Sequence, residues 1–384
     1  MRNVPKLRFK EFSNELINNY FFEFGDIKIG LTHTPTYVEN GKIFLSSKNI
    51  SKGYIDFEDV QYIAEEEFKT MPESTKPKKG DILFTRVGSN LGNPIILEEE
   101  KECAIFVSLG IFRVNDKANN YYIKHWMNTN YFWNQVEKKV AGGAKNNLNT
   151  TWLKEFKINI PTLQEQQKIA NFLSNVDKKI SITEEKLDLF KDYKKGVMQK
   201  IFNQELRFKD SKGNDYPEWE EKKLDDIMKV SSSTISQNTL EDNQGEYIIY
   251  GATGEIKKID FYDKEKEYIG IVKDGAGVGR CFYCEEKSSV LATLNYLDIK
   301  ENNNLKFCYY ILNKIDFTKY IVGSSIPHIY FKDYKFEKIQ LPCLEEQEKI
   351  ANFLSSIDKK IDNLIAELEN LKEFKKGLLQ QMFI

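Results

Sequence analysis

The stretch that most resembles a chemical site is a glycine-rich segment in the second half of the chain, Gly275-Ala-Gly-Val-Gly279. A phosphate-binding loop would need a Lys followed by Ser or Thr after the glycines, and this segment has neither. A dinucleotide-binding loop would open a helix, with an acidic residue about 20 positions later. Strand-forming residues follow instead, so the segment predicts a tight turn that brings backbone close to another group.

Other residues of catalytic type do not form a convincing set. Cys281 and Cys284 have the spacing of half a zinc site, with Cys308 and His328 as distant candidates, but the sequence has no second close pair. Two strand cysteines are the simpler interpretation. Acid-x-Lys triplets typical of nucleases, such as Asp298-Ile-Lys300, are expected by chance in a chain with 30% charged residues. The sequence therefore predicts no catalytic residue and no metal ligand.

Polar and basic side chains recur in loops at matched places of the two halves. Arg, Asn, Gln and Ser read the base edges of DNA, and Lys and backbone amides hold phosphates. The same composition is typical of solvated turns, which is the simpler interpretation for any single residue. As a set, these loops predict a DNA-binding surface. Its candidate residues are Lys78, Lys79, Arg86, Ser89, Asn90, Lys145, Asn146, Asn147, Lys273, Arg280, Ser324, Ser325, His328 and Tyr330.

The composition limits the class of protein. The 384 residues are enough for two or three domains, and 41% hydrophobic residues can form a real core. The formal charge is only −2, so DNA binding would need an uneven charge distribution or phosphate contacts from other subunits. Five cysteines, an odd number, favour a reducing cytosol over a disulfide framework. A polar N-terminus and the lack of a long apolar run predict a soluble cytoplasmic protein without a membrane segment.

The elements that must position the loops are indicated by an internal duplication. Residues 161–202 and 342–383 align without a gap, and about half of the positions are identical. Apolar residues recur in each copy with alternating steps of four and three, the spacing of a coiled-coil seam. A helix with one apolar stripe needs a partner, and the simplest partner is the other copy. The predicted helix-pair seam contains Ile169, Leu173, Val176, Ile180, Leu187, Ile350, Leu354, Ile357, Ile361 and Leu368.

Each predicted helix has about 38 residues, which gives a rod about 55 to 60 Å long at 1.5 Å per residue. Lys194 and Lys375 occupy equivalent seam positions. Such a lysine can fix the register of a helix pair, but the simpler interpretation is that each ammonium group extends to water near a helix end. Thr162 and Glu165 have the form of a capping box at the start of the first helix.

The two halves share a second, shorter sequence repeat, because Leu7-Arg-Phe-Lys10 recurs as Leu206-Arg-Phe-Lys209. Each half then contains a lead, a globular region and a long helix. Strand and helix patterns in both globular regions predict mixed α/β folds, with one helix over 121–140 and its counterpart over 305–319. The predicted division is 1–160 and 206–341 for the globular regions, and 161–205 and 342–384 for the helical regions.

With its parts in this order, the chain resembles the specificity subunit of type I restriction-modification systems over nearly its whole length. The resemblance rests on Gly80-Asp-Ile-Leu-Phe-Thr-Arg86 and on a Pro step into Glu-Gln-x-x-Ile and a long helix, at Pro161–Ile169 and again at Pro342–Ile350. One departure is that Ile269–Asp274 stands where the first half has Asp81–Arg86, which aligns Asp274 with Arg86. Two different half-sites would require such divergence.

The resemblance implies two α/β target-recognition domains separated by two long antiparallel coiled-coil helices, in a pseudo-two-fold repeat. Each domain would read one half of a bipartite, asymmetric site in double-stranded DNA, and the helices would set the spacing. Two methyltransferase (modification) subunits would dock on the helices, and restriction/translocase subunits would join for cleavage. The chain itself would be non-catalytic and without a cofactor, with S-adenosylmethionine, ATP and Mg on the partner subunits.

Two other interpretations stay open. A stand-alone restriction or methylation enzyme would bind S-adenosylmethionine as a single chain, although the sequence lacks Asn/Asp-Pro-Pro-Tyr/Phe and Phe-x-Gly-x-Gly. A coiled-coil scaffold without a nucleic-acid role would show no salt-dependent DNA binding even with partner subunits present.

Overall fold

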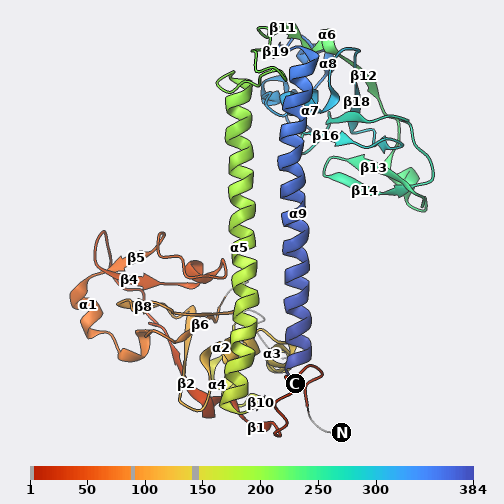
Figure 1. Cartoon of the computed structure of the whole chain (residues 1–384). Coiled ribbons are helices and arrows are strands. Elements are labelled where there is room, and N and C mark those ends of the chain that lie inside the picture. The colour runs from red at the N-terminus through yellow and green to blue at the C-terminus, as the bar shows by residue number, and fades with distance from the viewer. Residues whose placement is uncertain (1–3, 88–90, 141–146) are drawn as a thin grey trace. The chain divides into compact units, whose positions relative to one another are not determined.

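The computed structural model describes residues 4–87, 91–140 and 147–384. The chain forms two units, one of residues 1–185 with 366–384 and the other of residues 186–365. Two long continuous helices, α5 (Leu163–Phe202) and α9 (Leu344–Met382), each contribute to both units (Figure 1). Each unit therefore combines a globular part with a piece of both helices.

The globular part of the first unit contains two four-stranded sheets and a two-stranded ribbon. The larger sheet, which has the longer strands, has the order β2-β9-β6-β7, and all its neighbouring strands are antiparallel. The smaller sheet has the order β3-β5-β4-β8, in which β4 and β8 are parallel. The ribbon pairs β1 with β10. The strands are β1 (Ile17–Tyr20), β2 (Gly25–Ile29), β3 (Tyr37–Val38), β4 (Lys42–Leu45), β5 (Gln61–Ile63), β6 (Ile82–Thr85), β7 (Gly92–Ile96), β8 (Cys103–Ile105), β9 (Leu109–Val114) and β10 (Lys157–Ile160).

The short helices of the first unit are α1 (Glu65–Thr70), α2 (Asn120–Met127), α3 (Asn130–Val140) and α4 (Thr150–Leu153). The prediction of one helix over 121–140 is therefore wrong, because the helix is interrupted after Met127. The Asn128 amide donates to the carbonyl of Lys124 at 3.0 Å, and the Thr129 hydroxyl donates to that of Trp126 at 2.7 Å. Such local side-chain bonds satisfy carbonyls at the end of α2 and compete with helix continuation.

The second unit repeats this plan with a larger sheet of order β12-β18-β15-β16, a smaller sheet of order β14-β13-β17 and a ribbon of β11 with β19. The predicted helix over 305–319 is shorter, since α7 ends at Leu312 and a separate 3-10 helix covers Phe317–Tyr320. The elements are β11 (Glu220–Lys223), α6 (Leu224–Ile227), β12 (Met228–Ser232), β13 (Tyr247–Gly251), β14 (Gly254–Ile259), β15 (Tyr268–Val272), β16 (Cys281–Cys284), β17 (Ser289–Val290), β18 (Leu294–Ile299), α7 (Leu305–Leu312), α8 (Phe331–Tyr334) and β19 (Lys338–Leu341).

Strand pairing gives a residue-by-residue equivalence between the two larger sheets. Arg86 follows β6, donates its N–H to the carbonyl of Ser108 at 2.8 Å and accepts from the N–H of Leu148 at 2.7 Å. Lys273 follows β15 and makes the same two bonds, to Thr293 at 2.9 Å and from Ile329 at 3.0 Å. Arg86 is therefore equivalent to Lys273. The alignment of Arg86 with Asp274 is wrong by one residue, because strand pairing sets the register and string similarity does not.

The core of each unit forms where its larger sheet and its short helices meet the long helices. In the first unit, Phe112, Trp126 and Leu173 belong to one buried cluster with Leu378 of α9. In the second unit, the equivalent cluster joins Leu297, Phe307 and Leu354 with Ile201 of α5. Each of these side chains is fully or nearly fully buried. The long helices are therefore part of both cores, and they pack against each other within each unit.

Candidate nucleic-acid interface

The glycine-rich segment forms the turn of an antiparallel hairpin between β15 and β16. Gly275, Gly277 and Gly279 have φ of +86°, +88° and +86°, the left-handed region that glycine enters without a steric penalty. A Cβ atom on Gly279 would lie 2.6 Å from Cβ of Phe317. The segment is therefore a tight turn with a close backbone approach, as predicted, and a strand follows it in place of the helix that a dinucleotide loop opens.

Next to this turn, four polar or aromatic side chains form a connected cluster. The Asp274 carboxylate contacts Nδ1 of His328 at 2.7 Å and Nζ of Lys273 at 2.5 Å. The His328 ring stacks on Tyr330, with centroids 6.4 Å apart and an angle of 18° between the planes. Burial would raise the pKa of Asp274, but hydrogen bonds from Lys273 and His328 outweigh burial and hold the pKa below its usual value. Three candidates, Lys273, His328 and Tyr330, therefore lie together.

The other candidates of the second unit border the same region. The exposed Arg280 donates from Nη1 to the carbonyl of Ala252 at 3.1 Å. Ala252 lines a hollow of about 550 Å³, together with Thr293, whose carbonyl accepts the N–H of Lys273. Ser324 and Ser325 are exposed in the loop that leads to His328. The two loops are tied by the N–H of Gly275, which donates to the carbonyl of Pro327 at 2.9 Å.

In the first unit the equivalent loops are only partly described. Asn147 is exposed and forms a backbone bridge with Val87, as His328 does with Asp274. Asn147 is thus the counterpart of His328. The candidates Ser89, Asn90, Lys145 and Asn146 lie outside the described residues.

Arg86 does not lie on the open surface. It is 8% exposed and donates from Nη1 to the carbonyl of Val107 at 3.0 Å. Burial lowers the pKa of its guanidinium. The sequence predicts Arg86 as part of a DNA-binding surface, but the structure buries its side chain against the connection between β8 and β9.

Lys78 and Lys79 lie apart from Asn147. They are exposed in the turn that precedes β6, whereas Arg86 and Val87 follow the other end of that strand. The N–H of Lys78 donates to the carboxylate of Asp81, which is itself paired with Arg113 at 2.6 Å. The two lysines border a separate hollow of about 370 Å³. The structure therefore does not bring all candidates of the first unit into one group.

The predicted seam residues divide into two groups by burial. Leu187 and the three seam residues nearest the N-terminus of each long helix are buried, and the other three seam residues are half-buried. The three N-terminal seam residues of each helix also pack into the core of a globular part, so their burial is not due to the helix pair alone. The buried group is Ile169, Leu173, Val176, Leu187, Ile350, Leu354 and Ile357, and the half-buried group is Ile180, Ile361 and Leu368.

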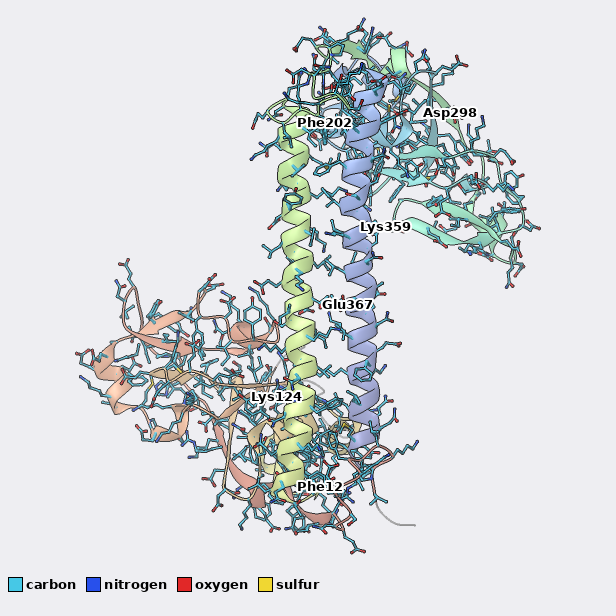
Figure 2. All side chains as sticks on the ribbon, viewed as in Figure 1. Phe12, Lys124, Phe202, Asp298, Lys359 and Glu367 are labelled. Carbon is cyan, nitrogen blue, oxygen red and sulfur yellow. The ribbon has the colours of Figure 1, made fainter. Side chains whose placement is uncertain are left out.

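The two seam lysines pair across the helices and do not extend to water as the simpler interpretation held. Lys375 of α9 contacts Asp177 of α5 at 2.6 Å in the first unit, and Lys194 of α5 contacts Asp358 of α9 in the second. Asp177 is also bound by Lys124 of α2 at 3.3 Å. Figure 2 labels Lys124 among the side chains of the first unit. Asp358 instead accepts from the Tyr310 hydroxyl of α7 at 2.7 Å. Each aspartate therefore ties the helix pair to a short helix of its own unit.

Sequence reasoning missed the ion pairs that join each repeated Leu-Arg-Phe-Lys lead to the start of a long helix. Glu165 is 1% exposed and accepts two bonds from Arg8, both at 2.7 Å, so its carboxylate does not serve a capping box with Thr162. Glu346 is 0% exposed and pairs with Arg207 at 2.8 Å. The signal was present, because Arg and Glu recur at the same places in both copies.

The glutamines that follow these glutamates also have matched roles. Gln166 donates to the carbonyl of Pro161 at 2.9 Å and accepts from the N–H of Asn119 at 2.8 Å. Gln347 makes the same contacts with Pro342 and Asn304, both at 2.9 Å. Each glutamine therefore fixes the start of a long helix against the start of α2 or α7.

Cys281 and Cys284 are buried thiols on β16, and burial raises the pKa of Cys284 to about 12. Across residues 4–87, 91–140 and 147–384, no cluster of three His, Cys, Asp or Glu side chains suits a metal ion. Within those same ranges, no helix has the length and apolarity to cross a membrane.

Comparison with known proteins identifies the family. Residues 35–190 and 216–373 each match the type I restriction modification DNA specificity domain. A Methanocaldococcus jannaschii protein named as the MjaX specificity subunit of a type I restriction enzyme is 31% identical over 338 residues, 78% of this chain and 76% of that protein. The type I restriction enzyme MjaVIII specificity subunit of the same organism is 24% identical over 379 residues, 89% of this chain and 88% of that protein.

Solved structures agree on the fold. The S subunit of a type I restriction-modification system from M. genitalium covers 99% of both chains with a TM-score of 0.68 at 17% identity. A chain from a structure titled for complex assembly and conformational transition of the type I R-M system covers 96% of this chain and 99% of its own, with a TM-score of 0.52 at 15% identity. The chain therefore belongs to the type I restriction-modification specificity subunits, the non-catalytic subunits of these enzymes.

Proposed function

We propose that this chain is the DNA-reading subunit of a type I restriction-modification complex, and that each of its units reads one half of a bipartite, asymmetric site. One observation carries the proposal. The larger sheets of the two units share their strand order and register but present different side chains at equivalent loop positions, such as Asn147 in one unit and His328 in the other. Equivalent placement gives both units the same approach to DNA, and different side chains give them different base preferences.

The long helices would set the spacing between the half-sites. The seam residues and the two Asp–Lys pairs hold α5 and α9 in one register within each unit. Because a helix rises 1.5 Å per residue, the length of these helices would determine which spacer the two readers can span.

Two methyltransferase subunits would dock on the same helices. Tyr193 of α5 and Phe374 of α9 occupy equivalent positions of the duplicated sequence and are 51% and 53% exposed. Exposed aromatic side chains at matching helix positions of the two units would suit two copies of the same partner. Restriction/translocase subunits would join this assembly, and the partner subunits would supply S-adenosylmethionine, ATP and Mg in the cytoplasm.

The test is methylome sequencing of cells with and without the gene. The expected result is one bipartite motif, with two defined halves and a spacer of fixed length, that disappears when the gene is deleted. A continuous motif, or a methylome that does not change, would contradict the proposal. S-adenosylmethionine binding by the purified single chain would favour a stand-alone methyltransferase instead.

A further inference from the structure

His328 combines a fixed backbone with a partly exposed side chain. Its backbone pairs with that of Asp274 directly after β15, and the next residue, Ile329, is 1% exposed and fixes the loop to the core. The imidazole itself is 34% exposed. Gly323, with φ of +90°, lets the loop pass close to the ring, since a Cβ there would lie 3.2 Å from Cδ2 of His328. The ring is therefore held in place on one side and open on the other.

The bound Asp274 determines which hydrogen-bonding atom the ring presents. Nδ1 is 2.7 Å from the Asp274 carboxylate, which is also bound by the ammonium group of Lys273. A carboxylate only accepts, so Nδ1 carries the hydrogen and donates it. In a neutral imidazole, Nε2 then keeps a lone pair, and no bond joins Nε2 to another residue in the described part of the chain.

An oriented acceptor selects a particular class of base edge. In the major groove, the donors are the exocyclic amino groups of adenine and cytosine, whereas guanine and thymine present acceptors at the corresponding positions. Building on the function proposed above, we propose that Nε2 of His328 accepts a hydrogen bond from the exocyclic amine of an adenine or cytosine in the half-site read by the second unit, with Asp274 and Tyr330 as its positioning residues.

The position of the first unit that is equivalent to His328 carries Asn147, a side chain with different hydrogen-bonding groups. Asn147 is exposed, and its bridge partner is Val87, whose side chain has no acceptor that could orient the Asn147 amide as Asp274 orients His328. An amide presents both a donor and an acceptor and suits the paired donor and acceptor of adenine. The two positions therefore give different readouts in otherwise matched loops.

The experiment uses the full chain co-expressed with its methyltransferase subunits and a pool of duplexes randomised over the length of a bipartite site. Bound duplexes are sequenced for wild type and for His328→Ala, His328→Gln, Asp274→Asn and Asn147→Ala. His328→Ala should reduce the preference for adenine or cytosine at one position of one half-site by about fivefold, the effect of a hydrogen bond of roughly 1 kcal/mol. Asp274→Asn should weaken the same preference, and Asn147→Ala should alter only the other half-site. Thermal unfolding of each complex checks that the variants fold.

Each outcome decides the matter. A motif unchanged by both His328 variants overturns the inference while the bipartite reading stands. Loss of a guanine preference also overturns it, because guanine would require a donating imidazolium. If wild type selects no bipartite motif, the proposed function fails and the inference fails with it. Loss of the adenine or cytosine preference in His328→Ala, with the other half-site intact, supports it.

Discussion

Asp177 of α5 and Lys375 of α9 form an ion pair of 2.6 Å in which both side chains are only about a quarter exposed. In the other unit the charges are exchanged between the helices, with Lys194 on α5 and Asp358 on α9. Each copy of the duplicated sequence thus supplies one Asp and one Lys, and antiparallel pairing brings them together in both units. The lysines that interrupt the apolar seam are therefore both paired across the helices, as expected of residues that fix a register.

This relationship predicts a measurable coupling in a double-mutant cycle of Asp177→Asn and Lys375→Met. Partial burial makes the pair stronger than an exposed one, so we expect a coupling of about 1 kcal/mol in the free energy of unfolding of the full chain in urea. Glu184 and Lys372 offer a matched control on the same two helices, because their pair of 2.7 Å is about half exposed. The control should couple by less than about 0.5 kcal/mol, and equal couplings would refute a special role for Asp177.

The same carboxylate predicts a pH dependence. Burial would raise the pKa of Asp177, but the charges of Lys375 and Lys124 outweigh burial and hold the pKa below its usual value. A depressed pKa adds stability above the unfolded-state value, about 3.9 for Asp, and this stability is lost as the pH falls through the folded-state pKa. The stability difference between wild type and Asp177→Asn should therefore be constant from about pH 7 to 5 and shrink below about pH 4. A difference that does not shrink at all as the pH falls below about 4 would contradict the argument.

The bidentate pair of Arg8 and Glu165 predicts a large loss of stability. Arg8→Ala leaves a carboxylate that is 1% exposed without its partner, which we expect to cost about 3 kcal/mol. Arg8→Lys should rescue only part of this, because one ammonium group cannot reproduce two parallel bonds. Lys168→Ala removes a neighbouring pair with Glu11 in which both side chains are about half exposed, and it should cost less than about 0.5 kcal/mol. Urea unfolding measures all three variants.

Two glycines of the hairpin turn give a comparison at the same φ. Gly275 and Gly279 both have φ of +86°, so alanine at either position carries a left-handed strain of about 1 kcal/mol. Nothing lies within 4 Å of a Cβ on Gly275, whereas a Cβ on Gly279 meets Phe317. Gly279→Ala should therefore lower the melting temperature clearly more than Gly275→Ala does. Equal losses of melting temperature would mean that the contact of Gly279 with Phe317 does not contribute to the cost of the substitution.

Local periodicity made part of this fold predictable. The apolar steps of four and three identify α5 and α9, and the strand and helix patterns of the globular regions identify their mixed α/β class. Both signals lie within a single element, so nothing beyond neighbouring residues is needed to read them. The internal duplication strengthened these predictions, because a pattern found in one half could be checked in the other half.

What depends on distant partners was not predictable in the same way. Strand β1 pairs with β10, which lies about 140 residues later. The alternating polar and apolar residues of β10 mark a strand, but they do not indicate its partner, and β1 lacks such an alternation. The burial of Arg86 depends on the Val107 carbonyl of a neighbouring strand connection. The Asp274–His328 contact joins loops 54 positions apart. Such contacts are set by strand register, which a sequence read in one dimension leaves open.

The division of labour between the two units is tested most directly by exchange. Residues 217–341 would be replaced by the corresponding segment of a relative with a different methylation motif, and the methylome of cells carrying the hybrid would be sequenced. The account predicts a new second half-site, with the first half-site and the spacer length retained. A hybrid motif in which both halves change, or in which neither does, would contradict it.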